Sequence, residues 1–280
     1  MSEYVIKKAN RKAKKLRLGL SAASGFGKTY GALLVAKGIC NGDLSKTCII
    51  DTEKDSSTLY ADLGEYSTLR LDAPYSPERY INAIITAENA GFDVIVIDSI
   101  THEWNGSGGC LEIQAALGGR YQDWAKVTPR HDAFINKILS SSCHIITTVR
   151  RKQDYDMVST NGKTTIQKVG TAEITRDGFE YELDINFEIV NEHHMVKVSK
   201  DRTRLFVDKP EFIITEETGK EILKWCNNGV DSLTAALSEV NLATEIVTLT
   251  EIFNQYKNEL KDNKEFIEAI KAQRSKIETK

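Results

Sequence analysis

The sequence lacks two features that would place the protein in a membrane or outside the cell. It contains no run of about 20 apolar residues, the length that a helix needs to cross a bilayer, and no recognisable signal peptide. It also lacks the cysteine spacing of a disulfide framework or a zinc site, because its five cysteines are odd in number, widely spaced and mostly set in apolar runs. Such cysteines fit buried thiols in a reducing compartment better than a disulfide framework or a zinc site. We therefore expect a cytoplasmic protein with no membrane partner.

An excess of charge of either sign is absent as well. The 37 lysines and arginines nearly balance the 40 aspartates and glutamates, which leaves a formal net charge of −3. This balance neither favours nor excludes nucleic-acid binding, because a local basic patch can bind phosphate on a chain that is nearly neutral overall. A chain of 280 residues lies near the upper size for one hydrophobic core, so we expect one large domain with a small appendage.

Residues 22–29, Ala-Ala-Ser-Gly-Phe-Gly-Lys-Thr, lie between an apolar run and a helix-like segment. They match the phosphate-loop pattern G-x-x-x-x-G-K-[ST], except that Ala22 replaces the first glycine. In this pattern backbone N–H groups surround the phosphates, the lysine (Lys28) reaches the β and γ oxygens, and the hydroxyl (Thr29) binds Mg²⁺. The helix that starts at the lysine adds its positive dipole end. We predict a site for ATP and Mg²⁺ formed by Ser24, Gly25, Phe26, Gly27, Lys28, Thr29 and Tyr30.

Short apolar segments alternate with helix signals after this loop. The predicted buried strands cover residues 47–51, 68–71, 92–98 and 143–149. Helices that open with Ser-Pro and Thr-Pro lie between them. This alternation predicts an α/β fold with a mainly parallel sheet and helices on both faces.

The second half of the chain changes character. Asn161-Gly162 between β-forming segments is a two-residue hairpin signal, and strand-like segments continue to residue 207. They predict an antiparallel C-terminal extension of the sheet. From Thr218 the apolar period becomes helical, which predicts a small helical appendage. The expected domains are a basic N-terminal arm at 1–15, a core at 16–228 and the appendage at 229–280.

Two acidic residues at predicted strand ends are candidates for metal binding and catalysis. The most hydrophobic strand, 92–98, ends in Asp98, which is typical of the strand that supports Mg²⁺ in P-loop proteins. Ser99 follows it in place of a glutamate, so the base must come from elsewhere. Glu53 lies just past the strand next in sequence to the phosphate loop, where it can polarise a water that faces the γ-phosphate.

Several motifs together resemble the RecA-like recombinase family. They are Asp51-Thr52-Glu53, Tyr60-Ala61 with Leu63-Gly64, Val96-Ile97-Asp98-Ser99 and Val198-Ser199-Lys200-Asp201-Arg202. The resemblance implies a RecA-like P-loop fold, ATP hydrolysis with Glu53 as the catalytic glutamate, and stacking of Tyr60 on adenine. It also implies that Lys200 and Arg202 contact the ATP of a neighbouring subunit in an oligomer. The two residues alternate on a predicted strand, so both face one side.

The short chain, with almost nothing before the phosphate loop, looks most like the phage-encoded RecA-core single-strand annealing ATPases. Residues 98–104 and 170–184 carry this narrower similarity. It implies a protein of the host cytoplasm that binds single-stranded DNA and promotes annealing and homologous recombination, with ATP hydrolysis stimulated by DNA. Recombinases sense the γ-phosphate with a glutamine where this chain has residues 147–150, which leaves Thr148 as the sensor. No subunit-linking strand is recognisable before the core, so a recombinase-style filament is not implied.

Two segments, residues 106–120 and 150–168, occupy the positions where RecA-like proteins carry their DNA-binding loops. The second begins with a basic run, Arg150, Arg151 and Lys152, that is suited to phosphate contacts. The alternative for this run is a solvated loop.

Further candidates for DNA contacts are aromatic or lie near the N-terminus. Trp104 and Tyr121 can stack on bases or pack in the core, and core packing is favoured. The basic residues between positions 7 and 15, among them Lys12 and Lys15, would share one face of a helix that tracks a phosphate backbone. The alternative is a solvated arm.

The leading hypothesis is therefore a RecA-like ATPase that binds single-stranded DNA. The alternative is an ATP-controlled loading or scaffold protein that recruits a single-strand binding or replication protein through its C-terminal helices and has little contact with DNA. A measurement of single-stranded DNA binding distinguishes these two hypotheses. No metal other than Mg²⁺ is expected, because His193-His194 and His102-Glu103 lack the neighbours of a metal site.

Overall fold

A computed structural model describes residues 11–160, 163–230 and 232–278. These residues form two compact units: Lys15–Leu223, and residues 11–14 together with 224–278. The boundary falls inside helix α7 (Glu216–Asn227). The predicted limits differ from this division, since residues 11–14 group with the C-terminal helices. None of the described helices is long and apolar enough to cross a membrane.

The larger unit is built on one sheet with the order β3-β2-β4-β5-β1-β7-β8-β9, and β6 pairs with β5 off this path. Neighbours from β3 to β7 are parallel, whereas β5–β6, β7–β8 and β8–β9 are antiparallel. The predicted fold class, a mainly parallel sheet with an antiparallel extension, is confirmed. The strands are β1 (Arg17–Ala22), β2 (Thr47–Asp51), β3 (Ser67–Arg70), β4 (Val94–Asp98), β5 (His144–Thr160), β6 (Lys163–Glu173), β7 (Ile185–Ile189), β8 (Met195–Asp201) and β9 (Phe212–Ile213).

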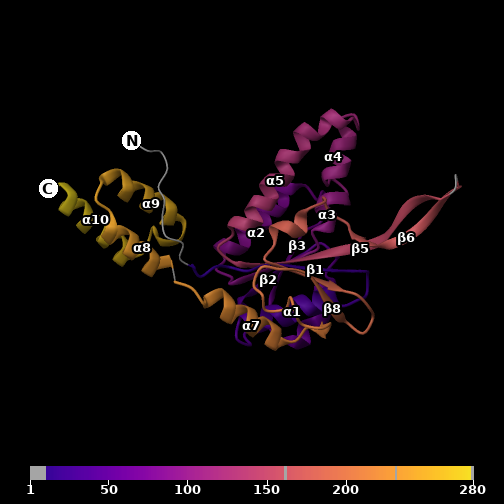
Figure 1. Ribbon diagram of the computed structural model, residues 1–280, viewed down its shortest axis with the longest axis horizontal. Coiled ribbons are helices and arrows are strands. Elements are labelled where there is room, and N and C mark those ends of the chain that lie inside the picture. Colours follow the sequence, from indigo (N-terminus) through magenta and orange to yellow (C-terminus); the bar gives the residue numbers. More distant parts are fainter. Residues whose placement is uncertain (1–10, 161–162, 231, 279–280) are drawn as a thin grey trace. The chain divides into compact units, whose positions relative to one another are not determined.

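Strand β5 continues far beyond the predicted strand at 143–149. Up to Arg150 it lies in the sheet beside β1, and from Arg151 it pairs with β6 as an antiparallel ribbon. Figure 1 shows this ribbon extending away from the sheet. The predicted turn at Asn161-Gly162 lies outside the described residues. One strand thus runs from the centre of the core into the ribbon.

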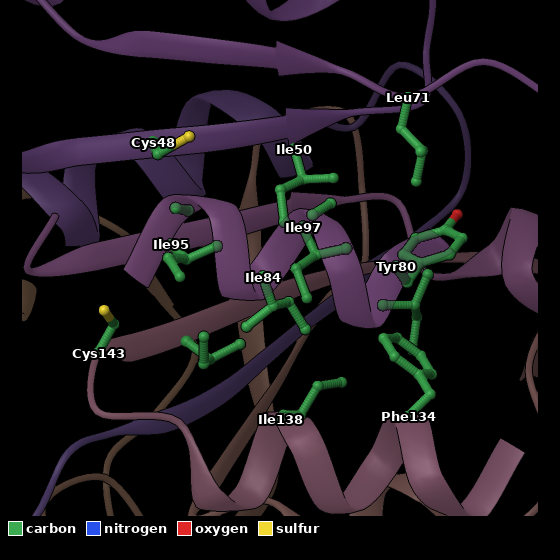
Figure 2. Packing of buried hydrophobic residues seen from close by; sticks show 14 of the residues in the cluster. Cys48, Ile50, Leu71, Tyr80, Ile84, Ile95, Ile97, Phe134, Ile138 and Cys143 are labelled. Atoms are coloured by element: carbon green, nitrogen blue, oxygen red, sulfur yellow. The ribbon is translucent and has the colours of Figure 1, made fainter. Parts of the chain in front are cut away.

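Helices α2 (Pro77–Asn89) and α5 (Trp124–Ser140) cover one face of the sheet (Figure 1). Apolar residues at helical spacing give each of them one buried face. Figure 2 shows the core that they form with the strands, with Cys48, Ile50, Leu71, Tyr80, Ile84, Ile95, Ile97, Phe134, Ile138 and Cys143 labelled. Burial of each of the larger apolar side chains stabilises the folded state by about 1.5–3 kcal/mol. This layer therefore holds β2 and β4 in place.

Helix α1 (Lys28–Ile39) follows β1 and crosses α7 at two glycines. A Cβ atom on Gly38 would lie 2.0 Å from the carbonyl oxygen of Glu216, and one on Gly219 would lie 2.2 Å from that of Val35. The two helix backbones are therefore in direct contact, which a larger residue at either position would prevent. This crossing fixes the helix that begins at the phosphate loop.

The buried Arg17 joins the start of β1 to the end of α5. Its side chain is 5% exposed, and its guanidinium donates to the carbonyl oxygens of Leu139 (3.1 Å), Ser141 (2.5 Å) and Cys143 (2.8 Å). Carbonyl groups at a helix C-terminus lack intrahelical partners and carry partial negative charge. The guanidinium supplies hydrogen-bond donors to these carbonyl groups and a positive charge that balances their partial negative charge.

His144, the first residue of β5, lies at the same edge of the sheet. Its Nδ1 accepts a hydrogen bond from the backbone N–H of Leu16 at 3.1 Å, which requires an unprotonated Nδ1. Burial lowers the pKa of His144 to about 3, and the charges of Lys15 and Arg17 add to this effect. His144 is therefore a neutral hydrogen-bond acceptor in the core. Lys15, a predicted DNA contact, is exposed and lies outside the described helices.

The smaller unit contains helices α8 (Ser232–Leu242), α9 (Ile246–Leu260) and α10 (Lys264–Glu278). Their shared core consists of Ala236, Val240, Ala243, Leu249, Ile252, Tyr256, Leu260 and Phe266. The segment at 11–14 adds an isolated β-bridge between Lys12 and Val230, with Ala13 N–H donating to Val230 O at 3.0 Å. Lys12 Nζ lies 4.4 Å from the centre of the Tyr256 ring and 3.7 Å from a carboxylate oxygen of Glu239. Lys12 is thus engaged within this unit, which argues against its predicted role in DNA binding; the basic residues at 7–10 lie outside the described residues.

Candidate active site

The phosphate loop connects β1 to α1, as predicted. Gly25 and Gly27 have φ angles of +85° and +88°, values that side-chain-bearing residues rarely adopt. Ala22 is the last residue of β1, so its extended backbone needs no glycine. Gly27 precedes α1 and no side chain caps the helix, which leaves the first N–H groups of α1 directed into the loop. The Nζ of Lys28 folds over the loop and donates to Ala23 O at 3.0 Å.

Asp98 and Thr29 meet at the end of β4. The hydroxyl of Thr29 donates to Asp98 Oδ2 at 2.5 Å, and the hydroxyl of Thr148 donates to Oδ1. Burial raises the pKa of Asp98, while the two hydroxyl groups counteract this shift. Carboxylate and hydroxyl oxygens are the hard ligands that Mg²⁺ prefers. The pair therefore fits the predicted Mg²⁺ site, with Thr29 and Asp98 as the protein groups around it.

Glu53 is held at the end of β2 by its neighbours. Asp51 Oδ1 accepts from the N–H of Glu53 at 2.7 Å, which fixes the turn after the strand. Ser99 Oγ donates to Glu53 Oε1 at 3.0 Å, and the guanidinium of Arg150 forms an ion pair with Oε2. Thr52 N–H donates to Asp98 O at 2.7 Å, so the two acidic strand ends are joined directly. The structure thus brings Lys28, Asp98 and Glu53 to one edge of the sheet.

The profile of the family described as AAA domain matches residues 14–223 of this chain. The chain belongs to the AAA domain family. It is therefore a P-loop NTPase, a class of nucleotide-binding ATPases that usually act with Mg²⁺. None of the curated proteins matches the chain.

Arg150 lies beside Glu53 in the candidate active site of this AAA domain, apart from Arg151 and Lys152. It pairs in register with Ala22, the residue that ends β1 before the phosphate loop. The Nζ of Lys28 donates to the carbonyl oxygen of the same Ala22 at 3.3 Å, so the two cations lie on the same side of the loop. Burial lowers the pKa of Lys28, the charge of Asp98 opposes this shift, and the charge of Arg150 adds to it. The DNA contact predicted for Arg150 stays a prediction, and in this structure its guanidinium is paired with Glu53.

The other two members of the basic run also differ from each other. Arg151 points to the opposite face of β5, where it lies 3.4 Å from a carboxylate oxygen of Glu173 and 3.3 Å from one of Glu188. Lys152 is exposed. The run does not form one basic cluster, because alternate residues of a strand face opposite sides. Within this run, Lys152 is the exposed residue, whereas Arg150 and Arg151 are half-buried.

The remaining nucleotide candidates lie near the phosphate loop. Tyr30, in the first turn of α1, contacts Tyr60 edge to face, with ring centroids 5.7 Å apart. Tyr60, the predicted adenine platform, therefore forms one aromatic surface with Tyr30. The predicted sensor Thr148 is fully buried and bonded to Asp98, so its hydroxyl belongs to the surroundings of the metal pair.

His194 is a residue at this site that the sequence reading missed. It lies in the turn between β7 and β8, and its Nδ1 is 2.9 Å from the carbonyl oxygen of Phe26 in the phosphate loop. A Cβ atom on Gly27 would lie 3.0 Å from the same nitrogen. The sequence reading considered the His193-His194 pair only as metal ligands. The signal that could have found it is topological, since β7 lies beside β1 and its far end must reach the loop.

Lys200 and Arg202 lie at the opposite edge of the sheet from the phosphate loop. Arg202 N–H donates to Asp184 O, next to the start of β7, and β7 begins beside the start of β1. The side chains of Lys200 and Arg202 both donate to the carbonyl oxygen of Tyr181, so they converge as the alternation predicts. Lys200 pairs with Asn186, which lies opposite Gly19 of β1, and both side chains are directed to Tyr181 and not to the phosphate loop.

A cleft lined by aromatic residues lies beside the connection from β4 to α5. This connection contains the short helices α3 (Thr101–Asn105) and α4 (Cys110–Ala116) and the 3₁₀ turn Tyr121–Asp123. The cleft has a volume of about 630 Å³, and Trp104 and Trp124 stack within it with centroids 5.5 Å apart. Tyr121 also lines it and is 88% exposed, so the favoured prediction of core packing is wrong for this residue.

Proposed function

We propose that this AAA domain hydrolyses ATP on a RecA-like core and binds single-stranded DNA to promote annealing and homologous recombination. The observation that carries the ATPase part is the meeting of Lys28, Asp98 and Glu53 beside a glycine-turned loop. Lys28 would contact the β and γ oxygens, and Thr29 with Asp98 would hold Mg²⁺, which neutralises phosphate charge when it is bound. Glu53 would polarise the attacking water.

Arg150 adds a cation that the sequence reading did not place at this site. Its ion pair holds Glu53 Oε2, while Ser99 holds Oε1, so the carboxylate orientation is fixed by two donors. Its backbone lies opposite Ala22, whose carbonyl oxygen accepts from Lys28 at 3.3 Å, so Arg150 would add positive charge near the place where negative charge develops on the transferred phosphoryl group. We therefore assign Arg150 to ATP hydrolysis and not to DNA binding.

The aromatic cleft supports binding of single-stranded DNA. Bases stack on exposed aromatic rings without regard to sequence, and cations next to them contact the backbone. A second cleft of about 630 Å³ adjoins the first, and Trp104 and Arg176 line both while Lys152 lines the second. Aromatic and basic side chains thus lie side by side on one surface of the core. The resemblance of residues 98–104 and 170–184 to the single-strand annealing ATPases supports annealing as the outcome of this binding.

Fluorescence anisotropy with a labelled single-stranded oligonucleotide, over a range of salt concentrations and with or without ATP, tests this assignment. Tyr121→Ala should weaken binding by about 5- to 150-fold, the equivalent of about 1–3 kcal/mol for one stacked base. Lys152→Ala should flatten the salt dependence by roughly 0.7 units of slope, the value for one phosphate contact on a single strand. Leu59→Ala and Lys271→Ala, which replace exposed residues elsewhere, are the matched controls.

Two further variants connect the site to its chemistry. Lys28→Ala should abolish nucleotide binding. Arg150→Ala should lower turnover at least tenfold and leave the affinity for DNA within twofold of the wild type. Lys152→Ala should weaken DNA binding and leave turnover within twofold of the wild type. Failure of the wild type to bind single strands or to accelerate annealing would reject the DNA-binding part of the proposal.

A second candidate function, ATP-controlled loading of a partner protein, is favoured by the surface of the C-terminal unit. Its described residues include exposed apolar side chains around the end of α8 and the start of α9: Leu242, Ile246 and Val247. Such residues suit contact with another protein. A single-strand binding or replication protein is the partner we propose for this surface. Polar substitution of Val247 should then abolish binding of that partner, measured by calorimetry with purified proteins, and leave ATP turnover unchanged.

A further inference from the structure

Three potential metal-binding side chains from three helices meet inside the larger unit. Glu103 comes from α3, Cys110 is the first residue of α4, and His131 lies in α5. Their ligand atoms all lie within 4.8 Å of one another. Their exposures are 1%, 0% and 4%, so all three are shielded from solvent. The cluster is separate from the phosphate loop and from the oxygen ligands at Thr29 and Asp98.

The contacts within the cluster are close and convergent. The Sγ of Cys110 donates to Glu103 Oε1 at 3.1 Å. The Nδ1 of His131 lies 3.1 Å from each of the two carboxylate oxygens. A tetrahedral zinc ion with bonds of about 2.0–2.3 Å separates its ligand atoms by roughly 3.3–3.6 Å. The two contacts to Glu103 are shorter than this by a few tenths of an ångström, and the Sγ of Cys110 and the Nδ1 of His131 lie within 4.8 Å of each other. Small movements of these side chains would therefore allow such an ion to bind.

The local sequence explains why these residues are held so closely. Residues 106–109, Gly-Ser-Gly-Gly, fold the chain tightly between α3 and α4. A Cβ atom on Gly109 would lie 2.6 Å from the carbonyl oxygen of Glu103. The backbone just before Cys110 is therefore in contact with the backbone of Glu103. Helices of five and seven residues are too short to be stable alone in water. This connection needs an anchor to α5, and His131 supplies the point of attachment.

The charges of the cluster suit a divalent ion of intermediate softness. One thiolate and one carboxylate cancel the two positive charges of the ion, so the loaded site is neutral and its burial costs little. The thiolate and the imidazole favour Zn²⁺ over Mg²⁺, whose preferred ligands are oxygen atoms. On binding, the ion would replace the thiol proton of Cys110, and His131 would bind through Nδ1 with its proton on Nε2. A water molecule would supply the fourth ligand.

We propose that Glu103, Cys110 and His131 form a structural site for Zn²⁺ that ties the α3–α4 connection to α5. The ring of Trp104 lies 5.6 Å from that of His131 and stacks on Trp124, so the ion would also fix one wall of the aromatic cleft. The ligands are 7 and 21 residues apart along the chain and belong to three helices, which matches no local zinc motif. This inference is independent of ATP hydrolysis and of DNA binding.

Metal content and cobalt absorption of the full-length, tag-free chain test the proposal. Chelator-treated protein that is incubated with Zn²⁺ and then desalted should retain one Zn²⁺ per chain in the presence of excess Mg²⁺. Loading with Co²⁺ should give the visible bands of a tetrahedral ion and a thiolate-to-cobalt charge-transfer band. Zn²⁺ should also raise the melting temperature of the chelator-treated protein.

Single substitutions then identify the ligands. Cys110→Ser should abolish the charge-transfer band, and His131→Gln should lower the affinity for Zn²⁺ at least 100-fold. Cys143→Ser, which removes another buried thiol on the same side of the sheet, should keep both signals. Circular dichroism identifies variants that fail to fold, and the wild-type cobalt spectrum does not depend on any variant. A wild type that retains no Zn²⁺ and shows no charge-transfer band, or a charge-transfer band that survives Cys110→Ser, would overturn the proposal.

Discussion

Acidification should destabilise the larger unit through His144, and the size of the effect follows from its pKa. The pKa of this group is about 3 in the folded protein, against 6.5 in its ordinary state. Between these values the unfolded chain binds a proton that the folded chain excludes, so stability is lost as the pH falls from about 6.5 towards about 3. Above pH 6.5 both states are neutral and this contribution is complete.

The expected loss is large enough to measure at moderately acidic pH. Each unit of pH below 6.5 costs about 1.4 kcal/mol, so the loss at pH 4.5 is about 2.7 kcal/mol. The physical cause is that a protonated imidazole cannot accept the N–H of Leu16 and would place a buried charge beside Arg17. Carboxyl groups also titrate in this range, so a matched variant is needed to isolate the effect of His144.

His144→Asn provides the comparison, because the amide oxygen of asparagine can accept the N–H of Leu16 without titrating. Urea unfolding should be followed by tryptophan fluorescence at pH 7.5 and pH 4.5, with Trp225→Phe in both proteins so that Trp104 and Trp124 report on the larger unit. The variant should be less stable at pH 7.5 because it loses part of a packed ring. The stability difference should shift by about 2.7 kcal/mol in favour of the variant at pH 4.5. A difference that stays constant between the two pH values would refute the reasoning.

Three other predictions concern the active site and the packing beside it. Glu53→Gln should bind nucleotide with nearly unchanged affinity and lose hydrolysis, because only the water-polarising carboxylate is removed; full turnover in a phosphate-release assay would reject its role as base. Gly38→Ala should lower the free energy of unfolding by about 2 kcal/mol or more, since its Cβ would meet the backbone of α7, whereas Gly31→Ala meets only the flexible end of Ile214 at 3.3 Å and should cost less in the same urea titration. Lys200→Ala/Arg202→Ala protein mixed with Glu53→Gln protein should regain ATPase activity, because some interfaces then carry an intact base and an intact cation pair. Exchange of subunits without any gain in activity would contradict a shared site.

The phosphate loop and the parallel core could be predicted from the sequence because their signals are local. The spacing of Gly25, Gly27 and Lys28 requires no knowledge of distant residues, and runs such as 92–98 are apolar because both faces of a parallel strand are buried. The fold class was confirmed on this basis. Asp98 was identified for the same reason, since the end of a buried strand is where an acidic side chain can meet the loop.

The position of Arg150 could not be predicted, because it depends on which residues lie opposite each other in the sheet. A basic run reads as one cluster in sequence, yet a strand directs Arg150 to Glu53 and Arg151 to the other face. The same holds for His194, which reaches the phosphate loop only because β7 pairs with β1. The aromatic cleft likewise combines residues from α3, a 3₁₀ turn and α5, whose proximity is set by the packing of that connection.

The placement of the phosphate loop and the Lys200–Arg202 pair at opposite edges of the sheet gives each subunit a direction. If the pair completes the site of a neighbour, the contact joins unlike surfaces, and the assembly is head to tail. An open chain of subunits then has one nucleotide site without a partner at one end and one unused cation pair at the other. Turnover per subunit should rise with the length of such a chain and approach a plateau. In a closed ring every site is complete, so turnover per subunit should be constant once the ring has formed.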